Sequence, residues 1–409
     1  MGVLGSDQRR TSSPLVIGGL CREKTLEETA SLKGIAGLGG GKVTDGNISV
    51  RQLGSLIFLC YIGDMILLFP STIAGMAEQN AWISCLLGIP GGLAVIWLLL
   101  KVSSLYPEMS LVEMSRSTMG KWLGTAVSLW YMYYFLISSA YLVREMGDFM
   151  TTMIYIQTPL PVIHLLFVLV IVLALLVGLE SIGRSSEIAL PLFILFAAIL
   201  IVCLAPKVDL HHLRPFGEGG MRSTLYGLLF TTGYSFGEMC VFLMILPSVR
   251  RKPHMNREIL LITGLSSLLL CLIVFMSLSV MGASLTKLTV YPTYFLAQLI
   301  NIGNFVQRIE AIMATAWLLT IFFKTVIYMY AFTKGCAQTF GLRNFHSLIL
   351  PAGLLLFGLA MEVSPNVEYY LKTILPYWIG WDTTNGIILP LLLLIVYGVR
   401  KKWTQSHSL

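Results

Sequence analysis

The feature that most constrains this chain is a series of long apolar segments that recur about every 35 residues after residue 50. A helix needs about 20 mainly apolar residues to cross the hydrocarbon core of a bilayer. Hydrophobic residues make up 56% of the chain and charged residues 12%, against about 45–50% and about 25% in soluble domains. The sequence therefore predicts an all-α integral membrane protein with ten transmembrane helices. The segments lie at residues 53–77, 82–104, 123–147, 162–179, 187–205, 223–246, 258–282, 309–333, 347–361 and 386–399.

The first 50 residues differ from the rest because they are polar and rich in glycine and contain no apolar run of signal-peptide length. We therefore expect a disordered cytoplasmic tail at residues 1–50, or an upstream start outside the fold, followed by a ten-helix, transporter-like domain at residues 51–403. The GLGGGK stretch at 37–42 has no Ser or Thr after Lys42, so we interpret it as a flexible linker rather than a phosphate loop.

The positions of Lys and Arg predict the orientation in the membrane. If the N-terminus is cytoplasmic, twenty Lys and Arg residues lie inside and six outside, and omitting those before Arg51 still leaves 14 against 6. Cytoplasmic loops carry the excess of Lys and Arg, so both termini are predicted to be cytoplasmic. The net charge of +7 is explained by this bias. We expect the lipid bilayer, and no nucleic acid, as a partner.

A short motif of glycine, an acidic residue and methionine occurs twice, at 63–65 and at 237–239. These positions fall in the first and sixth of ten spans, which is the offset expected for two five-helix repeats. Glycine and the nearby Pro70 and Pro247 weaken helices, and interrupted helices in corresponding positions of two halves indicate a ligand site near the membrane midplane. The exposed helix ends would suit a zwitterionic amino acid.

The glycines of these two spans have a second interpretation. Gly63, Gly233 and Gly237 would also allow neighbouring helices to pack closely, which is common in membrane proteins.

Three ionisable residues are predicted to lie at a similar depth in the membrane. Glu238 and Lys324 are roughly 14 Å from the cytoplasmic end of their spans, and Asp64 is at roughly 20 Å, at a rise of 1.5 Å per residue. An unpaired charge at this depth costs at least about 2.5–3.5 kcal/mol. We therefore expect Lys324 to pair with Glu238 or Asp64. The pair would either fix helix register or form a ligand-responsive charge cluster.

Other polar and aromatic residues have simpler interpretations. Arg144 and Asp148 are one turn apart at the outer end of the third span, beside Glu145, and are expected to form an ion pair at the rim. Tyr134 approaches mid-membrane, where it is either a pocket residue or a packing residue. Five aromatic residues in the predicted outer loop 363–386 favour an interfacial belt over an aromatic ligand cage.

Motifs for enzymatic or metal chemistry are missing from the sequence. It contains no HExxH and no CxxC, and most of its seven cysteines lie inside apolar segments. The adjacent His211 and His212 lack further ligand partners in the sequence. We therefore expect no enzyme activity, no cofactor and no metal site.

Four segments together are similar to a known family. The chain from about Ile48 to Trp403 resembles the membrane-embedded B subunit of bacterial spore germinant receptors, in the spore germination permease family of the amino acid, polyamine and organocation transporter superfamily. The resemblance is carried by QLGSLIFLCYIGDMILLFPS in span one, MGKWLG at 119–124, SFGEMCVFLMILP in span six and QRIEAIMATAWLLTIFFKTVIYMY at 307–330.

The resemblance implies a fold and a site. The fold would be a five-plus-five inverted repeat with interrupted first and sixth helices around a central pocket, which spans three and eight also line. Gly63, Gly237, Glu238 and Lys324 occupy matching motif positions, and Tyr134 matches loosely. The candidate ligand-binding residues are Gly63, Asp64, Tyr134, Gly233, Phe236, Gly237, Glu238 and Lys324.

The resemblance also implies a function. Members sense nutrients, often amino acids, in the spore inner membrane together with an A subunit and a lipoprotein C subunit. We therefore expect nutrient germinant sensing at a transporter-like pocket. The alternatives are an amino acid permease that works by alternating access, and a channel or water pore gated by the receptor. The sensor and the permease would share one fold, so the fold alone does not separate them.

Overall fold

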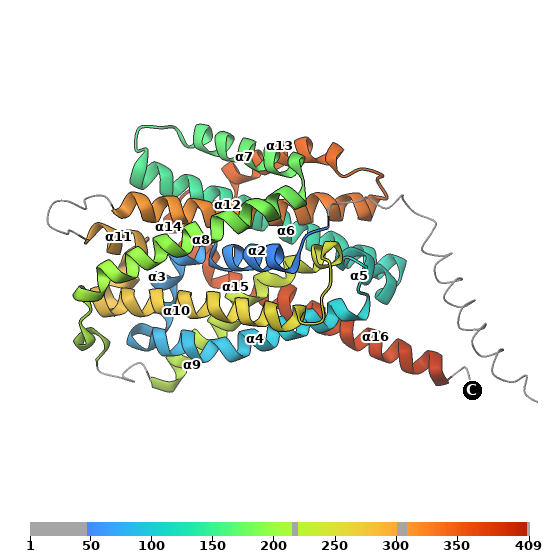
Figure 1. Cartoon of the computed structure of the whole chain (residues 1–409), viewed down its shortest axis with the longest axis horizontal. Coiled ribbons are helices and arrows are strands. Elements are labelled where there is room, and N and C mark those ends of the chain that lie inside the picture. The colour runs from blue at the N-terminus through green and yellow to red at the C-terminus, as the bar shows by residue number, and fades with distance from the viewer. Residues whose placement is uncertain (1–46, 215–219, 301–308, 407–409) are drawn as a thin grey trace, which may run out of the picture. The chain divides into compact units, whose positions relative to one another are not determined.

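A computed structural model describes residues 47–214, 220–300 and 309–406 (Figure 1). These residues are almost entirely helical; within them no β-strand forms, and a single isolated parallel bridge joins Ile48 to Val249. The predicted tail, residues 1–50, lies outside the described residues except for its last four. Each of the ten predicted apolar segments overlaps one or more helices.

The helices of the N-terminal half are α2 (Val50–Ile62), α3 (Met65–Ala77), α4 (Ala81–Leu105), α5 (Leu111–Met119), α6 (Lys121–Phe149), α7 (Leu160–Val177) and α8 (Leu179–Leu204). Those of the C-terminal half are α9 (Gly220–Phe230), α10 (Met255–Leu288), α11 (Pro292–Gln298), α12 (Ile309–Phe340), α13 (His346–Glu362), α14 (Val367–Tyr369), α15 (Leu375–Thr383) and α16 (Leu389–Ser406). Short 3₁₀ turns are η1 (Glu78–Asn80), η3 (Ala205–Lys207), η4 (Leu210–Leu213), η6 (Glu238–Met244) and η7 (Leu246–Ser248). Single π-helical turns are η2 (Met150–Ile154), η5 (Thr231–Ser235), η8 (Tyr370–Ile374) and η9 (Thr384–Ile388).

The length and composition of these helices establish a multi-pass membrane protein. Within the described residues, 8 helical stretches are long and apolar enough to cross a membrane. One of them, Met65–Leu105, continues from α3 through η1 into α4, and two shorter apolar helices are Val50–Ile62 and His346–Glu362. The predicted all-α membrane fold is confirmed, whereas the number of ten membrane crossings stays a prediction.

The first predicted span is interrupted, as the sequence predicted. Helix α2 begins with a capping box in which Ser49 Oγ accepts from Gln52 N at 3.1 Å and Gln52 Oε1 accepts from Ser49 N at 2.8 Å. The helix ends at Ile62, and Gly63 has the non-helical angles φ 13° and ψ −113°. Helix α3 then starts after Asp64. The break therefore places a glycine carbonyl and an acidic side chain at the junction of two half-helices.

The sixth predicted span is interrupted by a different local structure. Helix α9 ends at Phe230, the π-turn η5 follows, and the chain continues through Phe236 and Gly237 into the 3₁₀ turn η6. Two changes of helical type within fifteen residues alter the spacing of side chains, because 3₁₀ and π turns differ from an α-helix in residues per turn. Glu238 is the first residue of η6, so this break also presents an acidic side chain.

The interrupted helices are packed inside the bundle. Helix α2 contacts α8, α10 and α12, and Figure 1 shows it between α8 and α10. Helix α12 also packs along α6, and the π-turn η5 contacts α4 and α15. Helix α12 therefore contacts both interrupted segments, through α2 and η6, as the family resemblance implied for span eight.

One expectation about a connecting segment was wrong. The predicted outer loop 363–386 is helical over most of its length, because α14, η8, α15 and most of η9 lie within it. Residues such as Leu375 and Trp378 are buried there. A segment that packs onto the bundle must satisfy its backbone groups internally, which a helix does.

Candidate functional site

The three ionisable residues predicted to share a layer form one contact cluster, which we name the charged cluster: Asp64, Glu238 and Lys324. Lys324 Nζ on α12 donates hydrogen bonds to Asp64 Oδ1 and to Glu238 Oε2. All three side chains are at most 5% exposed. The sequence predicted that Lys324 pairs with one of the two acids, and the structure shows that it bridges both. The cluster therefore joins the two interrupted segments through a single lysine.

Neutral donors complete the polar contacts around the cluster. Tyr234 Oη donates to Asp64 Oδ2 at 3.1 Å, and Tyr328 Oη donates to the carbonyl oxygen of Glu238 at 3.0 Å. Thr320 Oγ1 donates to the carbonyl oxygen of Gly63 at 3.0 Å, which satisfies an acceptor that the helix break leaves free. Burying a polar group costs free energy unless the group is hydrogen-bonded, so these contacts explain why the helix break is tolerated inside an apolar bundle.

Gly63 has a specific steric role in this arrangement. A Cβ atom at position 63 would lie 2.4 Å from Lys324 Cδ and 2.9 Å from the carbonyl oxygen of Cys60. Any larger residue would therefore displace the lysine stem from its path to the two acids. The glycine at the first break is needed for the charged cluster.

The cluster borders a small cavity, which we name the central cavity. Its charged lining residues are Asp64, Glu145, Glu238 and Lys324, and its aromatic lining residues are Tyr141, Tyr328, Tyr370 and Trp378. Its volume is about 10 Å³, which is room for about one water molecule. The structure is therefore closed around this site, and any organic ligand must enlarge it.

The other predicted site residues lie near the cavity without lining it. Gly233 and Gly237 face the segment α15–η9: a Cβ on Gly237 would lie 2.6 Å from the carbonyl oxygen of Asp382. Phe236 packs edge-on against Tyr61, at 5.1 Å between ring centroids. The close-packing interpretation of the glycines therefore describes Gly233 and Gly237.

Tyr134 belongs to a hydrogen-bonded group next to the cavity. Its hydroxyl donates to Asp382 Oδ1 at 2.8 Å and lies 3.4 Å from the hydroxyl of Tyr328, which lines the cavity. Tyr134 thus supports a cavity residue from behind.

Several cavity residues were missed by sequence reasoning. On α6 these are Ser138, Tyr141, Leu142 and Glu145. Their spacing of three, four and seven residues places them on one helix face, which the sequence alone could have indicated. Glu145 was instead grouped with Arg144 and Asp148 at the rim.

The prediction of an interfacial belt was wrong for two of the five aromatic residues, Tyr370 and Trp378. Both are less than 10% exposed and line the central cavity. Tyr369 and Tyr377, at 43% and 78% exposed, remain available for the membrane interface. The difference arises because the helical segment folds back onto the bundle, so that one of its faces is internal.

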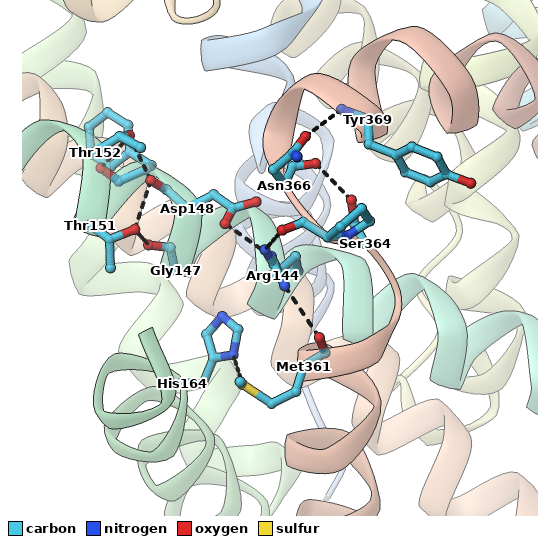
Figure 2. A network of polar contacts seen from close by, with 12 residues as sticks. Arg144, Gly147, Asp148, Thr151, Thr152, His164, Met361, Ser364, Asn366 and Tyr369 are labelled. Atoms are coloured by element: carbon cyan, nitrogen blue, oxygen red, sulfur yellow. Dashed lines mark hydrogen bonds and ion pairs between the residues drawn. The ribbon is translucent and has the colours of Figure 1, made fainter. Parts of the chain in front are cut away.

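Arg144 holds the start of the helical segment 367–383, which carries Tyr370 and Trp378, in place (Figure 2). Its Nε donates to Asp148 Oδ1 at 3.0 Å, which confirms the predicted ion pair, although the pair is buried rather than solvated. Its two other nitrogens donate to the carbonyl oxygens of Met361 and Pro365, at 3.3 and 2.8 Å. Figure 2 shows the guanidinium directed from α6 at the end of α13. Arg144 thereby fixes the turn that leads into α14.

We expect the substitution Arg144→Ala to weaken, without abolishing, the nutrient response that the family resemblance implies, because Arg144 positions the segment after α13 but does not line the cavity. The variant loses hydrogen bonds to two carbonyls and one carboxylate, so its stability should fall by about 1–3 kcal/mol. Thermal unfolding and the nutrient concentration for half-maximal response measure the two effects. Arg144→Lys, which keeps the charge beside Asp148, should be closer to wild type. A complete loss of response in a stably folded Arg144→Ala protein would contradict this prediction.

No metal centre is indicated in the part of the chain that the structure describes, where no three His, Cys, Asp or Glu side chains are arranged to hold a metal ion. The site combines buried opposite charges, hydroxyl groups and aromatic rings. Its polar groups come from the two interrupted segments, from helices α6 and α12, and from the segment η8–α15. The fold and site thus define a transporter-like membrane protein.

Comparisons with known proteins identify the family. The sequence profile described as "Spore germination protein" matches residues 47–367. Spore germination protein KB of Bacillus subtilis (strain 168) is 28% identical, over 88% of this chain and 97% of its own length. Spore germination protein GerLB of Bacillus cereus is 23% identical, over 88% of this chain and 96% of its own length. The chain therefore belongs to the spore germination protein family. This confirms the resemblance to germinant receptor B subunits that the four motifs carried.

A solved structure supports the fold. The transporter Mhp1, of the nucleobase-cation-symport-1 family, in a closed conformation with bromovinylhydantoin bound, matches with a TM-score of 0.63 over 85% of this chain and 79% of its own. The sequence identity is 13%, so this likeness concerns the fold alone. None of these descriptions names an enzyme.

Proposed function

We propose that this subunit senses a small nutrient, an amino acid or a similar molecule, that binds in the central cavity. The observation that carries the proposal is the charged cluster, in which one lysine joins the two interrupted segments beside a buried cavity. A ligand that competes for these charges would change how the two segments are held together. Such a ligand shifts a conformational equilibrium only if it binds one state more tightly than the other.

The candidate ligand-binding residues have different parts in this proposal. Asp64, Glu238 and Lys324 line the cavity and would contact the ligand directly. Gly63 keeps the lysine path open, and Gly233 and Gly237 hold the sixth span against α15 and η9. Tyr134 supports the lining residue Tyr328 from behind, and Phe236 packs against Tyr61 close to the break in the sixth span.

The sensing proposal includes partners and a location. In the spore inner membrane, the subunit would pass the conformational change to an A subunit and a lipoprotein C subunit. Both termini would be cytoplasmic, as the Lys and Arg distribution predicts.

The experiment that tests sensing uses spores that lack this gene. We expect such spores to lose germination with one nutrient in a panel of amino acids, sugars and nucleosides, and to recover it when the wild-type gene is restored. A response to every nutrient that equals that of the parent spores would contradict the proposal.

The second candidate is an amino acid permease, favoured by the likeness of fold to a transporter. Measuring the uptake of labelled amino acids into proteoliposomes that contain the full chain distinguishes the sensing function from the permease function. The sensing proposal predicts binding without concentrative uptake, and robust concentrative transport by this chain alone would favour the permease.

A further inference from the structure

Glu145 stands out among the buried charges because it lacks a partner. It is 4% exposed and lines the central cavity, yet its Oε1 has no hydrogen-bond partner among the described residues. The adjacent Arg144 is directed away, to Asp148 and to two carbonyls at the end of α13. Ser138, two turns earlier on the same face of α6, lines the cavity too, and its Oγ also lacks a partner there. Two polar groups thus face the cavity unsatisfied.

Acidic side chains outnumber basic ones in the lining of the central cavity. Three carboxyl side chains line it, Asp64, Glu145 and Glu238, against the single cation Lys324. Lys324 already bridges Asp64 and Glu238. Asp382 adds a further buried acid behind Tyr134. The lining therefore offers no free cation to bind the negative charge of a ligand, and it offers at least one free carboxyl group to bind a positive charge.

The aromatic residues that line the cavity also favour a positively charged ligand. The ring of Tyr141 packs against the rings of Tyr370 and Trp378, with centroid separations of 5.4 Å and 4.8 Å respectively. Aromatic ring faces attract cations electrostatically within about 6 Å. The metal-binding geometry that a small inorganic ion such as zinc would need is not formed by the described residues. An ammonium group, which has three donors and the size of a water molecule, matches the lining better.

We propose that Glu145 binds the ammonium group of the nutrient, so that the central cavity selects ligands that carry a primary amine. The proposal deepens the proposed function and rests on it. The ammonium group would donate to Glu145 Oε1 and Ser138 Oγ, beside the rings of Tyr370 and Trp378. A carboxylate on the ligand is not needed for this contact. A matched amine without a carboxylate should therefore bind, whereas the matched acid without an amine should not.

The experiment measures thermal stabilisation of the full-length protein in lipid nanodiscs by defined probes. L-alanine and L-valine carry both groups, ethylamine and isobutylamine carry only the ammonium group, and propionate and isovalerate carry only the carboxylate. Glucose and inosine serve as uncharged nutrients. We expect at least one amino acid and its matched amine to stabilise the wild type, and neither acid to do so.

Substitution of Glu145 gives the second arm. In Glu145→Gln, affinity for the amine probes should fall roughly 10- to 100-fold, as expected for the loss of a hydrogen bond to a charged group. Without ligand, this variant should be at least as stable as wild type, because it removes an unpaired buried carboxylate. If Glu145 had a purely structural role, the Glu145→Gln protein would instead be less stable than wild type. Glu180→Gln, an exposed acid paired with Arg184 on α8, is the matched control and should bind as wild type does.

The outcomes separate this inference from the proposed function. If Glu145→Gln binds amines as tightly as wild type, or if the acids bind and the amines do not, the inference is wrong. Stabilisation by glucose or inosine and by no amine would overturn the ammonium selection and leave nutrient sensing intact. If no probe of any class stabilises the wild type, both fail.

Discussion

Lys324→Met is expected to abolish the nutrient response and to lower the stability of the bundle. The substitution keeps an unbranched chain of similar length, so the stem can still pass Gly63, but it removes the positive charge that bridges Asp64 and Glu238. Removing one member of a buried ion pair costs about 3–5 kcal/mol, because a charge is left buried without a partner. Thermal unfolding of the purified protein and nutrient-triggered germination of spores measure the two effects.

A compensated variant separates loss of folding from loss of function. In Lys324→Met combined with Asp64→Asn and Glu238→Gln, no charge of the cluster remains, so most of the lost stability should return. The response should stay absent, because the two interrupted segments are no longer joined by charge. Glu238→Gln alone should also abolish the response. Restoration of both stability and response in the triple variant would mean that the cluster only fixes helix register. A normal response in stably inserted Lys324→Met would refute the charge-cluster proposal outright.

Much of this site could be predicted from sequence because the bilayer restricts what buried residues can do. A charge in the middle of an apolar segment requires a partner, and the rise of an α-helix places Glu238 and Lys324 at one depth. The glycines beside two of the acids indicated breaks at 63–64 and near 237, which the structure shows. These inferences needed only helix geometry and the cost of an unpaired charge.

The missed residues depended on tertiary packing that helix geometry does not fix. Trp378 and Tyr370 reach the cavity because the segment after α13 folds back over the bundle, and Arg144 holds the turn that directs it. The contact between Gly237 and Asp382 likewise joins parts of the chain 145 residues apart (382 − 237). Spacing along one helix carries no information about such contacts. Glu145, in contrast, shares a face with Ser138 and could have been found.

Gly237→Ala should disturb the site strongly, because the added methyl group would meet backbone atoms rather than a flexible side chain. Its Cβ would lie 2.6 Å from the carbonyl oxygen of Asp382 and 2.9 Å from that carbonyl carbon. These are backbone atoms, so no side-chain rotation relieves the clash, and η6 must move away from α15. Overpacking of this kind costs about 1–3 kcal/mol. Because Glu238 follows Gly237 directly, the shift also displaces Glu238 from Lys324, and we expect the nutrient response to be lost.

Neighbouring glycines provide a graded control for this prediction. Gly380, on the same α15, has open space where a Cβ would be, so Gly380→Ala should leave the response unchanged and stabilise the helix by up to about 1 kcal/mol. At Gly233 the nearest atom, 2.5 Å away, is Thr383 Oγ1, the end of a side chain that can rotate, so Gly233→Ala should be intermediate. The expected order of stability is therefore Gly380→Ala, Gly233→Ala, then Gly237→Ala. If Gly237→Ala behaves like Gly380→Ala, the backbone contact between the sixth span and α15 does not hold Glu238 in place, and the position of Glu238 depends instead on its contacts with Lys324 and Tyr328.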